Sequence, residues 1–135
     1  MSKEDSLLNS LVVDEDTADQ EVLSSILHPY LRIGGESGRL IFESAYEDLR
    51  AKEKVLIVLA AQLAKVILGM EESAWLSPSK ISKQGGIKKG TVDPTVRDLY
   101  GDGLLDGEDG RYRIPRTKLH EVEKLLDIQT DESSS

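Results

Sequence analysis

The apolar and polar positions of the first fifty residues predict one helix and one hairpin. From Thr17 onward the apolar residues recur at helical spacing, and Gln20 completes a capping-box pattern, so we expect a helix that ends before Pro29. Residues 30–33 and 39–42 are short β-favouring runs on either side of a glycine-rich turn, a pattern typical of a hairpin. Two short strands need a surface that covers them, so we expect this unit to pack on a further element.

The most apolar segment of the chain follows, and it predicts a central helix. Twelve of the positions from residue 55 to residue 68 are apolar, and Gln62 and Lys65 are the two exceptions. A helix over about residues 52–69 would be apolar nearly all round, and such a helix must be covered on most sides. Gly69 is a suitable residue to end it. We therefore expect the N-terminal helix and hairpin to pack on this central helix and to share one core with the rest of the chain.

The next segment predicts two consecutive helices. Ser77 is a suitable N-cap and the proline after it a suitable first helical residue, so a short helix is expected to run to about Gln84, where glycines 85 and 86 end it. After a brief turn, Thr91 can cap a second helix. The apolar side of that second helix would carry Val92, Val96, Leu99 and Tyr100.

A second hairpin and a last helix complete the pattern. Residues 104–105 and 111–114 predict two strands joined by a turn over residues 106–110. A helix is then expected from Lys118 to about Asp127, because its apolar residues share one side. These residues are Leu119, Val122, Leu125 and Leu126.

These elements divide the chain into four parts. Residues 1–16 combine a short apolar cluster with an acidic run and show no sustained period, so we expect a flexible acidic N-terminus. Residues 17–50 form the helix and hairpin extension, residues 51–127 the main domain, and residues 128–135 are expected to be a disordered tail. With 39% hydrophobic and 31% charged residues, the chain of 135 residues is typical of one globular domain, here of the α+β class.

The order of elements from residue 51 onward resembles the winged helix-turn-helix superfamily: a long helix, a short strand near Trp75, a short helix, a turn, a helix and a hairpin. The stretch LSPSKISKQGGIKKGTVDPTVRDLYGDGLL is similar to that family's pattern, with a Gly90-Thr91-Val92 entry into the recognition helix and a Gly103-Leu104-Leu105 entry into the wing. The resemblance covers residues 51–127. It implies a winged-helix fold in which the recognition helix enters the major groove of DNA, while flanking cations and helix N-termini hold phosphates.

The resemblance places candidate DNA contacts on both short helices and on the hairpin. From Lys80 to Arg97 five basic residues stand against one acid, Asp93, which makes a local charge of +4. Such a charge can serve as a phosphate-binding footprint for double-stranded DNA. By this resemblance Lys80, Lys83, Lys88 and Lys89 would contact phosphates, Thr91, Thr95 and Arg97 would face the groove, and Arg111 and Arg113 would touch the backbone from the wing.

The overall charge supports a second hypothesis. The chain has 17 basic and 25 acidic residues, a net charge of −8, and its first fifty residues account for −7 of it (4 basic against 11 acidic). A net anion is repelled by the DNA backbone. Asp93 and Asp98 on the second helix, and Glu108 and Asp109 at the hairpin tip, also oppose contact with DNA. The alternative is therefore a protein-interaction or dimerisation module on the same scaffold, in which the apolar residues of the segment 7–13 fold on a partner.

Other kinds of chemistry lack the residues they need. The absence of cysteine excludes disulfides, thiolate zinc sites and thiol catalysis, and nothing in the sequence points to an enzyme, a metal or a cofactor. The glycine-rich run at residues 34–38 lacks the Lys-Ser/Thr ending of a phosphate loop, and His28 and His120 lie far apart in the sequence. No window of eighteen apolar residues occurs and the N-terminus is too polar for a signal peptide, so we expect a soluble cytoplasmic protein without a membrane segment.

Overall fold

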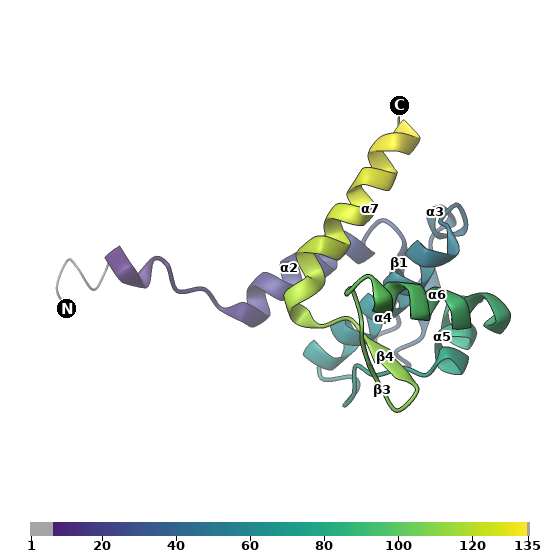
Figure 1. The fold of residues 1–135 in the computed structure, drawn as a ribbon. Helices are drawn as coiled ribbons and strands as arrows, with labels where there is room; N and C mark the ends of the chain where they lie inside the picture. The colour runs from purple at the N-terminus through teal and green to yellow at the C-terminus, as the bar shows by residue number, and fades with distance from the viewer. Residues whose placement is uncertain (1–6, 135) are drawn as a thin grey trace.

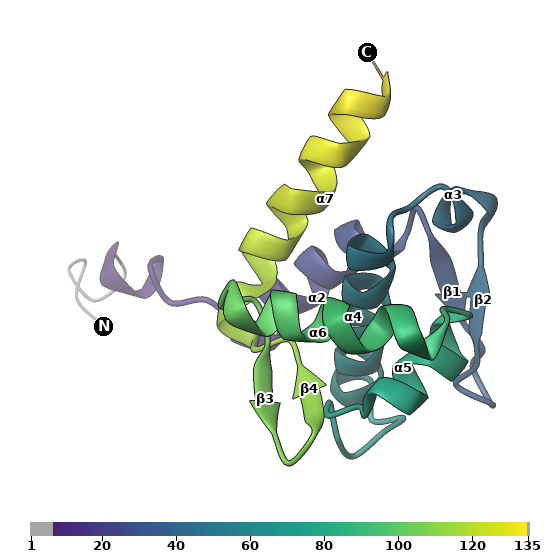
Figure 2. The ribbon, with the colours of Figure 1, turned by 45° about the vertical axis from the view of Figure 1, so that its right-hand side comes forward.

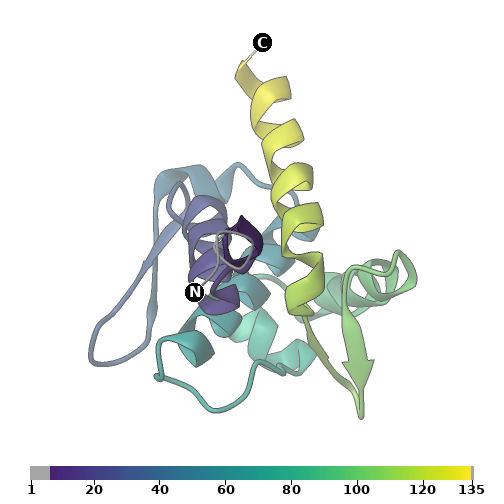
Figure 3. The same cartoon turned by 90° about the vertical axis from the view of Figure 1, so that its left-hand side faces the viewer.

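The computed structural model describes the backbone of residues 7–134 and the side chains of residues 7–127 (Figure 1). It is a mixed fold of helices with two small antiparallel hairpins, which confirms the predicted α+β class. The two hairpins lie on opposite sides of the molecule, with the central helix between them (Figures 2 and 3). In chain order the elements are α2 (Glu15–Leu27), β1 (Leu31–Ile33), β2 (Leu40–Phe42), α3 (Ser44–Glu47), α4 (Ala51–Ile67), α5 (Pro78–Gly85), α6 (Lys89–Gly101), β3 (Asp106–Glu108), β4 (Arg111–Arg113), the 3-10 helix η1 (Arg116–Lys118) and α7 (Leu119–Ser134).

Helix α4 is the central helix that the apolar run predicts. Every residue from Val55 to Lys65 is buried, and the helix packs against α2, α5 and α6. Gly69 ends it as expected, with a positive φ of 77°. The N–H of Gly69 donates to the carbonyl of Val66 (3.0 Å) and the N–H of Met70 to the carbonyl of Lys65 (2.8 Å). These two bonds form a Schellman cap, whose left-handed position favours glycine.

The N-terminal extension packs on the core, as predicted. Helix α2 contacts α4 through its buried residues, which are Val22, Leu23, Ile26 and Leu27. Strands β1 and β2 pair with Leu31 opposite Phe42. The short helix α3, which the sequence analysis did not predict, buries Tyr46, whose ring stacks on Phe42 with 4.0 Å between ring centroids. The Tyr46 hydroxyl donates to the carbonyl of Gly85 (2.6 Å), so the extension is also tied to the end of α5.

Two helices begin earlier in the chain than their predicted caps. Helix α2 begins at Glu15 and not at Thr17, because the carboxylate of Asp14 accepts hydrogen bonds from two backbone N–H groups of the first turn (3.0 and 3.3 Å). Helix α6 begins at Lys89, so Thr91 lies inside the first turn and does not cap it. The residue before α6 makes no side-chain cap hydrogen bond, and a cap pattern therefore does not mark this start.

The second strand of the second hairpin lies where it was predicted, in β4 (Arg111–Arg113), but the first strand lies later in the chain. Strand β3 (Asp106–Glu108) falls inside the segment expected to be the turn. The turn itself is confined to Asp109 and Gly110, which have positive φ angles of 52° and 75°. Such two-residue turns match the twist of paired strands. Leu104 and Leu105, expected to form a strand, are buried in the core instead. Because the turn takes up only two residues, Asp106–Glu108 can pair with Arg111–Arg113.

Helix α7 continues beyond its predicted end. The sequence analysis expected the helix to end near Asp127 and residues 128–135 to be disordered, but the backbone is helical through Ser134. Neither glycine nor proline follows Asp127, so the sequence contains no residue that stops a helix there. The end of α7 projects from the body of the molecule (Figure 1).

One arginine links the N-terminal extension to the segment before α7. Arg116 in η1 forms salt bridges with Asp16 and Asp19 of α2, so the extension is linked to the start of α7. The predicted flexible N-terminus includes residues 1–6, which lie outside the described residues, as does residue 135. None of the helices that the structure describes is long and apolar enough to cross a membrane.

Candidate nucleic-acid interface

Helix α5 presents two of the predicted lysines. The hydroxyl of Ser77 caps the helix by accepting from the backbone N–H of Lys80 (3.3 Å). At the other end Gly85 is buried, and a Cβ at that position would lie 2.8 Å from Val58 of α4. The absence of a side chain at Gly85 therefore lets α5 lie directly on the core. Lys80 and Lys83 are on its exposed side.

A groove of about 540 Å³ lies between α5, the segment that precedes it and β4. Lys80, Lys83 and Arg111 line this groove together with Trp75. Glu71 is the one carboxylate among the lining residues that the structure describes. None of the three cations forms a salt bridge with a described residue. We call this feature the α5 groove; its positive charge is not neutralised by close acidic partners.

Strand β4 directs its two arginines away from α6. An isolated bridge joins Tyr112 of this strand to Leu76, at the place where a short strand was expected near Trp75. The ring of Tyr112 meets the ring of Tyr100 of α6 edge-on, with 6.4 Å between centroids. Because successive side chains of a strand face opposite sides, Arg111 and Arg113 lie on the other face of the hairpin.

Arg113 is bound within the fold. Its Nε donates to the carboxylate of Asp106 across the hairpin (3.0 Å), and its guanidinium lies 4.4 Å from the centre of the Trp75 ring. A cation held between a carboxylate and an aromatic face has fewer donors left for a ligand. The predicted role of Arg113 as a phosphate contact is thus weaker than that of Arg111.

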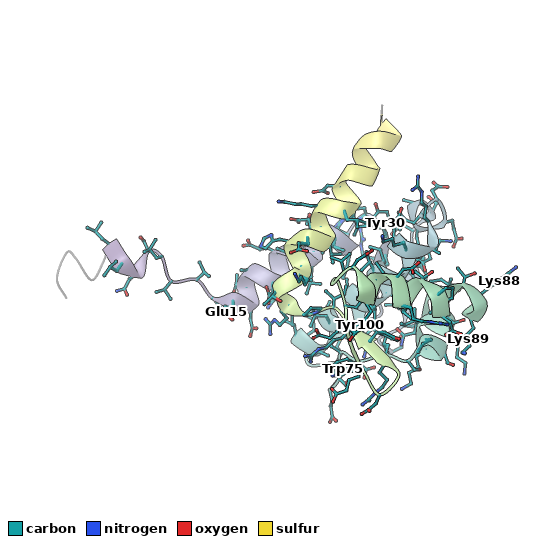
Figure 4. The ribbon with its side chains drawn as sticks, in the orientation of Figure 1. Glu15, Tyr30, Trp75, Lys88, Lys89 and Tyr100 are labelled. Carbon is teal, nitrogen blue, oxygen red and sulfur yellow. The ribbon has the colours of Figure 1, made fainter. Side chains whose placement is uncertain are left out.

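Helix α6 carries its cations beside acids of its own. Lys88 and Lys89 are exposed at its N-terminal end (Figure 4). The ammonium of Lys89 forms a salt bridge with Asp93 one turn later (3.3 Å). Arg97 is exposed, and its Nε donates to the backbone carbonyl of Asp93 (3.3 Å). Only part of the positive charge on this helix is therefore available to a phosphate.

The side of α6 that faces solvent carries a line of small residues, flanked by the exposed Arg97, Asp98 and Tyr100. Gly90, Pro94 and Gly101 are exposed, and a Cβ at either glycine would meet no atom within 4 Å. Thr91 and Thr95 are half-buried, and the hydroxyl of Thr95 donates to the carbonyl of Thr91 (2.7 Å). An approaching ligand could thus come close to the backbone of this helix.

The nine predicted residues fall into two groups. The first group, which we call the α6 surface, consists of Lys88, Lys89, Thr91, Thr95 and Arg97. The second group belongs to the α5 groove or its edge and consists of Lys80, Lys83, Arg111 and Arg113. The β3–β4 hairpin separates them at one end, because its Tyr112 faces α6 while Arg111 lines the groove.

A second basic pocket was missed by the sequence analysis. It has a volume of about 480 Å³ and lies between the β1–β2 turn and α5, lined by Ser37, Gly38, Arg39, Leu40, Lys65, Lys83 and Gln84. Lys65 is only 5% exposed. Burial lowers the pKa of Lys65, and the charge of Glu71 acts in the opposite direction. The one sign of this pocket in the sequence was Lys65 within an apolar run. Such a position indicates that the side chain is buried, but it does not show which residues surround it.

The described residues contain no group of three or more His, Asp or Glu side chains that could hold a metal ion. Comparisons with protein-family models, with curated proteins and with solved structures gave no match to this chain.

Proposed function

We propose that residues 51–127 form a winged helix-turn-helix domain and that the protein is a non-enzymatic, DNA-binding regulator of transcription. The order of elements supports this proposal. Helix α4, the Leu76 bridge, α5, α6 and the β3–β4 hairpin follow one another as a long helix, a short strand, two helices and a wing. In such a domain the second of the two short helices, here α6, enters the major groove.

The observation that carries the proposal is the uncovered side of α6. Gly90, Pro94 and Gly101 are exposed along one line of the helix, so its backbone can come close to base edges there. Arg97 is exposed beside them, and an arginine can donate two hydrogen bonds to one guanine. Lys88 at the N-terminal end is placed to contact a phosphate, as helix N-termini favour anions.

Cations next to α6 would add phosphate contacts. Lys89 would contribute once its salt bridge with Asp93 opens, and Lys80 and Lys83 of α5 would reach the flanking backbone. The half-buried Thr91 would lie at the edge of the groove. Four lysine–phosphate contacts correspond to a slope of about −3.6 in a plot of log affinity against log salt.

The experiment is fluorescence anisotropy with mixed-sequence duplex DNA at about 50 to 200 mM salt. The double variant Lys88→Glu/Lys89→Glu should bind about 100-fold more weakly at 0.1 M salt, because each lost phosphate contact costs a factor near 8 and the new charges repel the backbone. The control, Lys118→Glu/Lys124→Glu, changes the net charge by the same amount. Its two residues lie at the end of η1 and in α7, away from α6. Unchanged affinity in the first variant, or equal loss in the control, overturns the proposal.

A protein-interaction function is the second candidate, and the segment before α2 favours it. Leu7, Leu8, Leu11, Val12 and Val13 are between 63% and 75% exposed, which is unusual for five apolar residues so close together. This segment extends from the body of the molecule (Figure 1). We expect it to fold on a partner, and the simplest partner is a second copy of the chain.

Sedimentation velocity at increasing protein concentration tests this candidate. Dimerisation that disappears when Leu7, Leu8 and Leu11 are replaced by serine supports it. A chain that stays monomeric while it binds DNA supports the first candidate alone.

A further inference from the structure

The pocket between the β1–β2 turn and α5 has the composition of an anion site. Its charged lining residues in the described part of the chain are Arg39, Lys65 and Lys83, and all three are cations. Ser37 and Gly38 of the hairpin turn line the same pocket. Such a concentration of positive charge without a carboxylate among the lining residues favours an anionic ligand.

Lys65 provides the strongest evidence for a ligand. Its side chain is 95% shielded from solvent, since 5% is exposed, yet no hydrogen bond or salt bridge joins its ammonium to another residue within 7–127. Glu71 attracts it from a longer distance. The stem of Lys65 is buried, whereas its Nζ is not among the described buried polar atoms that lack a partner, so the ammonium reaches the pocket. A cation at the end of a buried stem and without a close partner favours an anionic ligand. An anion in the pocket would supply the partner that the fold does not.

The hairpin turn is shaped to leave room beside this lysine. Gly38 has a φ of +71°, and a Cβ there would lie 3.9 Å from Cδ of Lys65. The hydroxyl of Ser37 accepts the backbone N–H of Arg39 (3.1 Å), so its own proton can be donated to a ligand. Any side chain in place of Gly38 would strain the turn and narrow the pocket.

We propose that this pocket binds a phosphoryl group, held by Arg39, Lys65 and Lys83 and by the hydroxyl of Ser37. A phosphoryl group has several acceptor oxygens, which can be shared among an arginine fork and two ammonium groups. The pocket shares Lys83 and Gln84 with the α5 groove, so the two hollows adjoin. The phosphoryl group can therefore belong to a DNA strand that continues past α5 or to a small phosphorylated ligand.

The test is an NMR titration of the full chain with inorganic phosphate and with pyrophosphate, against sodium chloride at the same ionic strength. We expect saturable shifts of the backbone amides of residues 37–40 and 83–85. Lys65→Met and Lys83→Gln should each weaken binding about tenfold, the effect of one lost hydrogen bond between charged groups. Lys124→Gln on α7, which removes the same charge far from the pocket, should leave binding unchanged. Methionine keeps the length of the buried side chain, so the Lys65 variant should fold.

A titration without saturable shifts at these residues, or equal affinity of Lys65→Met and the unaltered chain, would overturn this proposal. Duplex DNA distinguishes the two sources of the phosphoryl group. If DNA displaces phosphate, the pocket holds a backbone phosphate; if both bind together, it holds a small ligand. The Lys88→Glu/Lys89→Glu variant tests the DNA proposal separately, because neither residue lines this pocket.

Discussion

The two short helices that follow α4 present their positive charge in different ways. On α5, Lys80 and Lys83 line a groove and have no acidic partner within salt-bridge distance among the described residues. On α6, Lys89 is paired with Asp93, and Asp98 adds a second exposed acid. Of the local charge of +4 from Lys80 to Arg97, Lys80 and Lys83 carry +2 without acidic partners. Lys88, Lys89 and Arg97 with Asp93 carry the other +2, which Asp98 reduces to +1.

The helices also differ in how tightly they are held. The end of α5 lies against α4 and α3 through Gly85, whereas the exposed side of α6 contacts no other element at Gly90 or Gly101. We infer that the two helices would contribute differently to DNA binding. Helix α5 would contribute lysines without acidic partners, and α6 would contribute a backbone that a ligand can approach.

The largest expected effect is on stability. A Cβ at Gly85 would lie within 3.0 Å of side-chain atoms of Val58, Tyr46 and Ile87, so Gly85→Ala should lower the free energy of unfolding by about 2–3 kcal/mol. Gly101→Ala is the matched control on α6, where the new methyl group meets nothing and alanine favours the helix by about 0.5–1 kcal/mol. Urea denaturation measures both variants. Equal stability would show that α5 is no more tightly held than α6.

The next effect concerns the hydrogen bond that holds the end of α5. Tyr46→Phe removes the donor to the buried Gly85 carbonyl and should cost about 1–2 kcal/mol. Burial, with a contribution from Glu47, raises the pKa of Tyr46. The unfolded chain releases this proton near pH 10 while the folded chain keeps it, so stability should fall as the pH rises above about 10. Urea denaturation at about pH 8 and pH 10.5 should show a smaller alkaline loss in the phenylalanine variant; an equal loss would contradict this role.

A smaller effect should appear on the α6 surface. Asp93→Asn removes the carboxylate that binds Lys89, and the freed ammonium can contact a phosphate. We expect DNA affinity to rise about fivefold at 0.1 M salt, with a steeper salt dependence, because one phosphate contact is gained. Asp127→Asn on α7 gives the same change in net charge away from the site. If both variants gain equally, the effect comes from overall charge and not from the salt bridge.

The elements best predicted from the sequence were those whose position follows from their own residues and not from contacts with distant segments. The apolar run of α4 and the stop at Gly69 leave few alternatives, because such a helix must be buried and such a turn needs a positive φ. The start of α6 was missed because no side chain caps it. Strand β3 was missed because Asp109 and Gly110 form a tighter turn than their polar neighbours suggest.

The candidate site was predicted less completely, because contacts between distant segments decide it. The sequence identified the cations of α5, α6 and β4 but not that Tyr112 faces α6 and so turns Arg111 toward the opposite side. Arg39 lies far from α5 in the chain and joins Lys83 only when the β1–β2 turn folds against that helix. Periodicity shows which side of an element is buried, and it does not show which polar groups meet.

The smallest expected effect concerns Lys65, which lines the pocket between the β1–β2 turn and α5. Replacing it distinguishes a structural role of this lysine from a role in ligand binding. Because burial lowers the pKa of Lys65, its charged form is less favourable in the folded chain than in the unfolded chain. The unfolded chain therefore binds more protons between the lowered pKa and the ordinary lysine value near 10.4, and the contribution of this group to stability rises with pH in that window. Lys65→Met removes the charge.

In phosphate-free buffer, the Lys65→Met chain should be at least as stable as the unaltered chain near pH 7, and its advantage should shrink toward about pH 11. Glu71, whose charge acts on Lys65, and Arg39 and Lys83, which line the same pocket, are present in both proteins. The alkaline loss caused by Tyr46 is also common to both, so it cancels in the difference. Urea denaturation across this range measures the effect. A stability difference that does not change with pH would mean that the ammonium of Lys65 bears no cost in the folded chain, and the pocket beside α5 would then have no unpaired charge for an anion to neutralise.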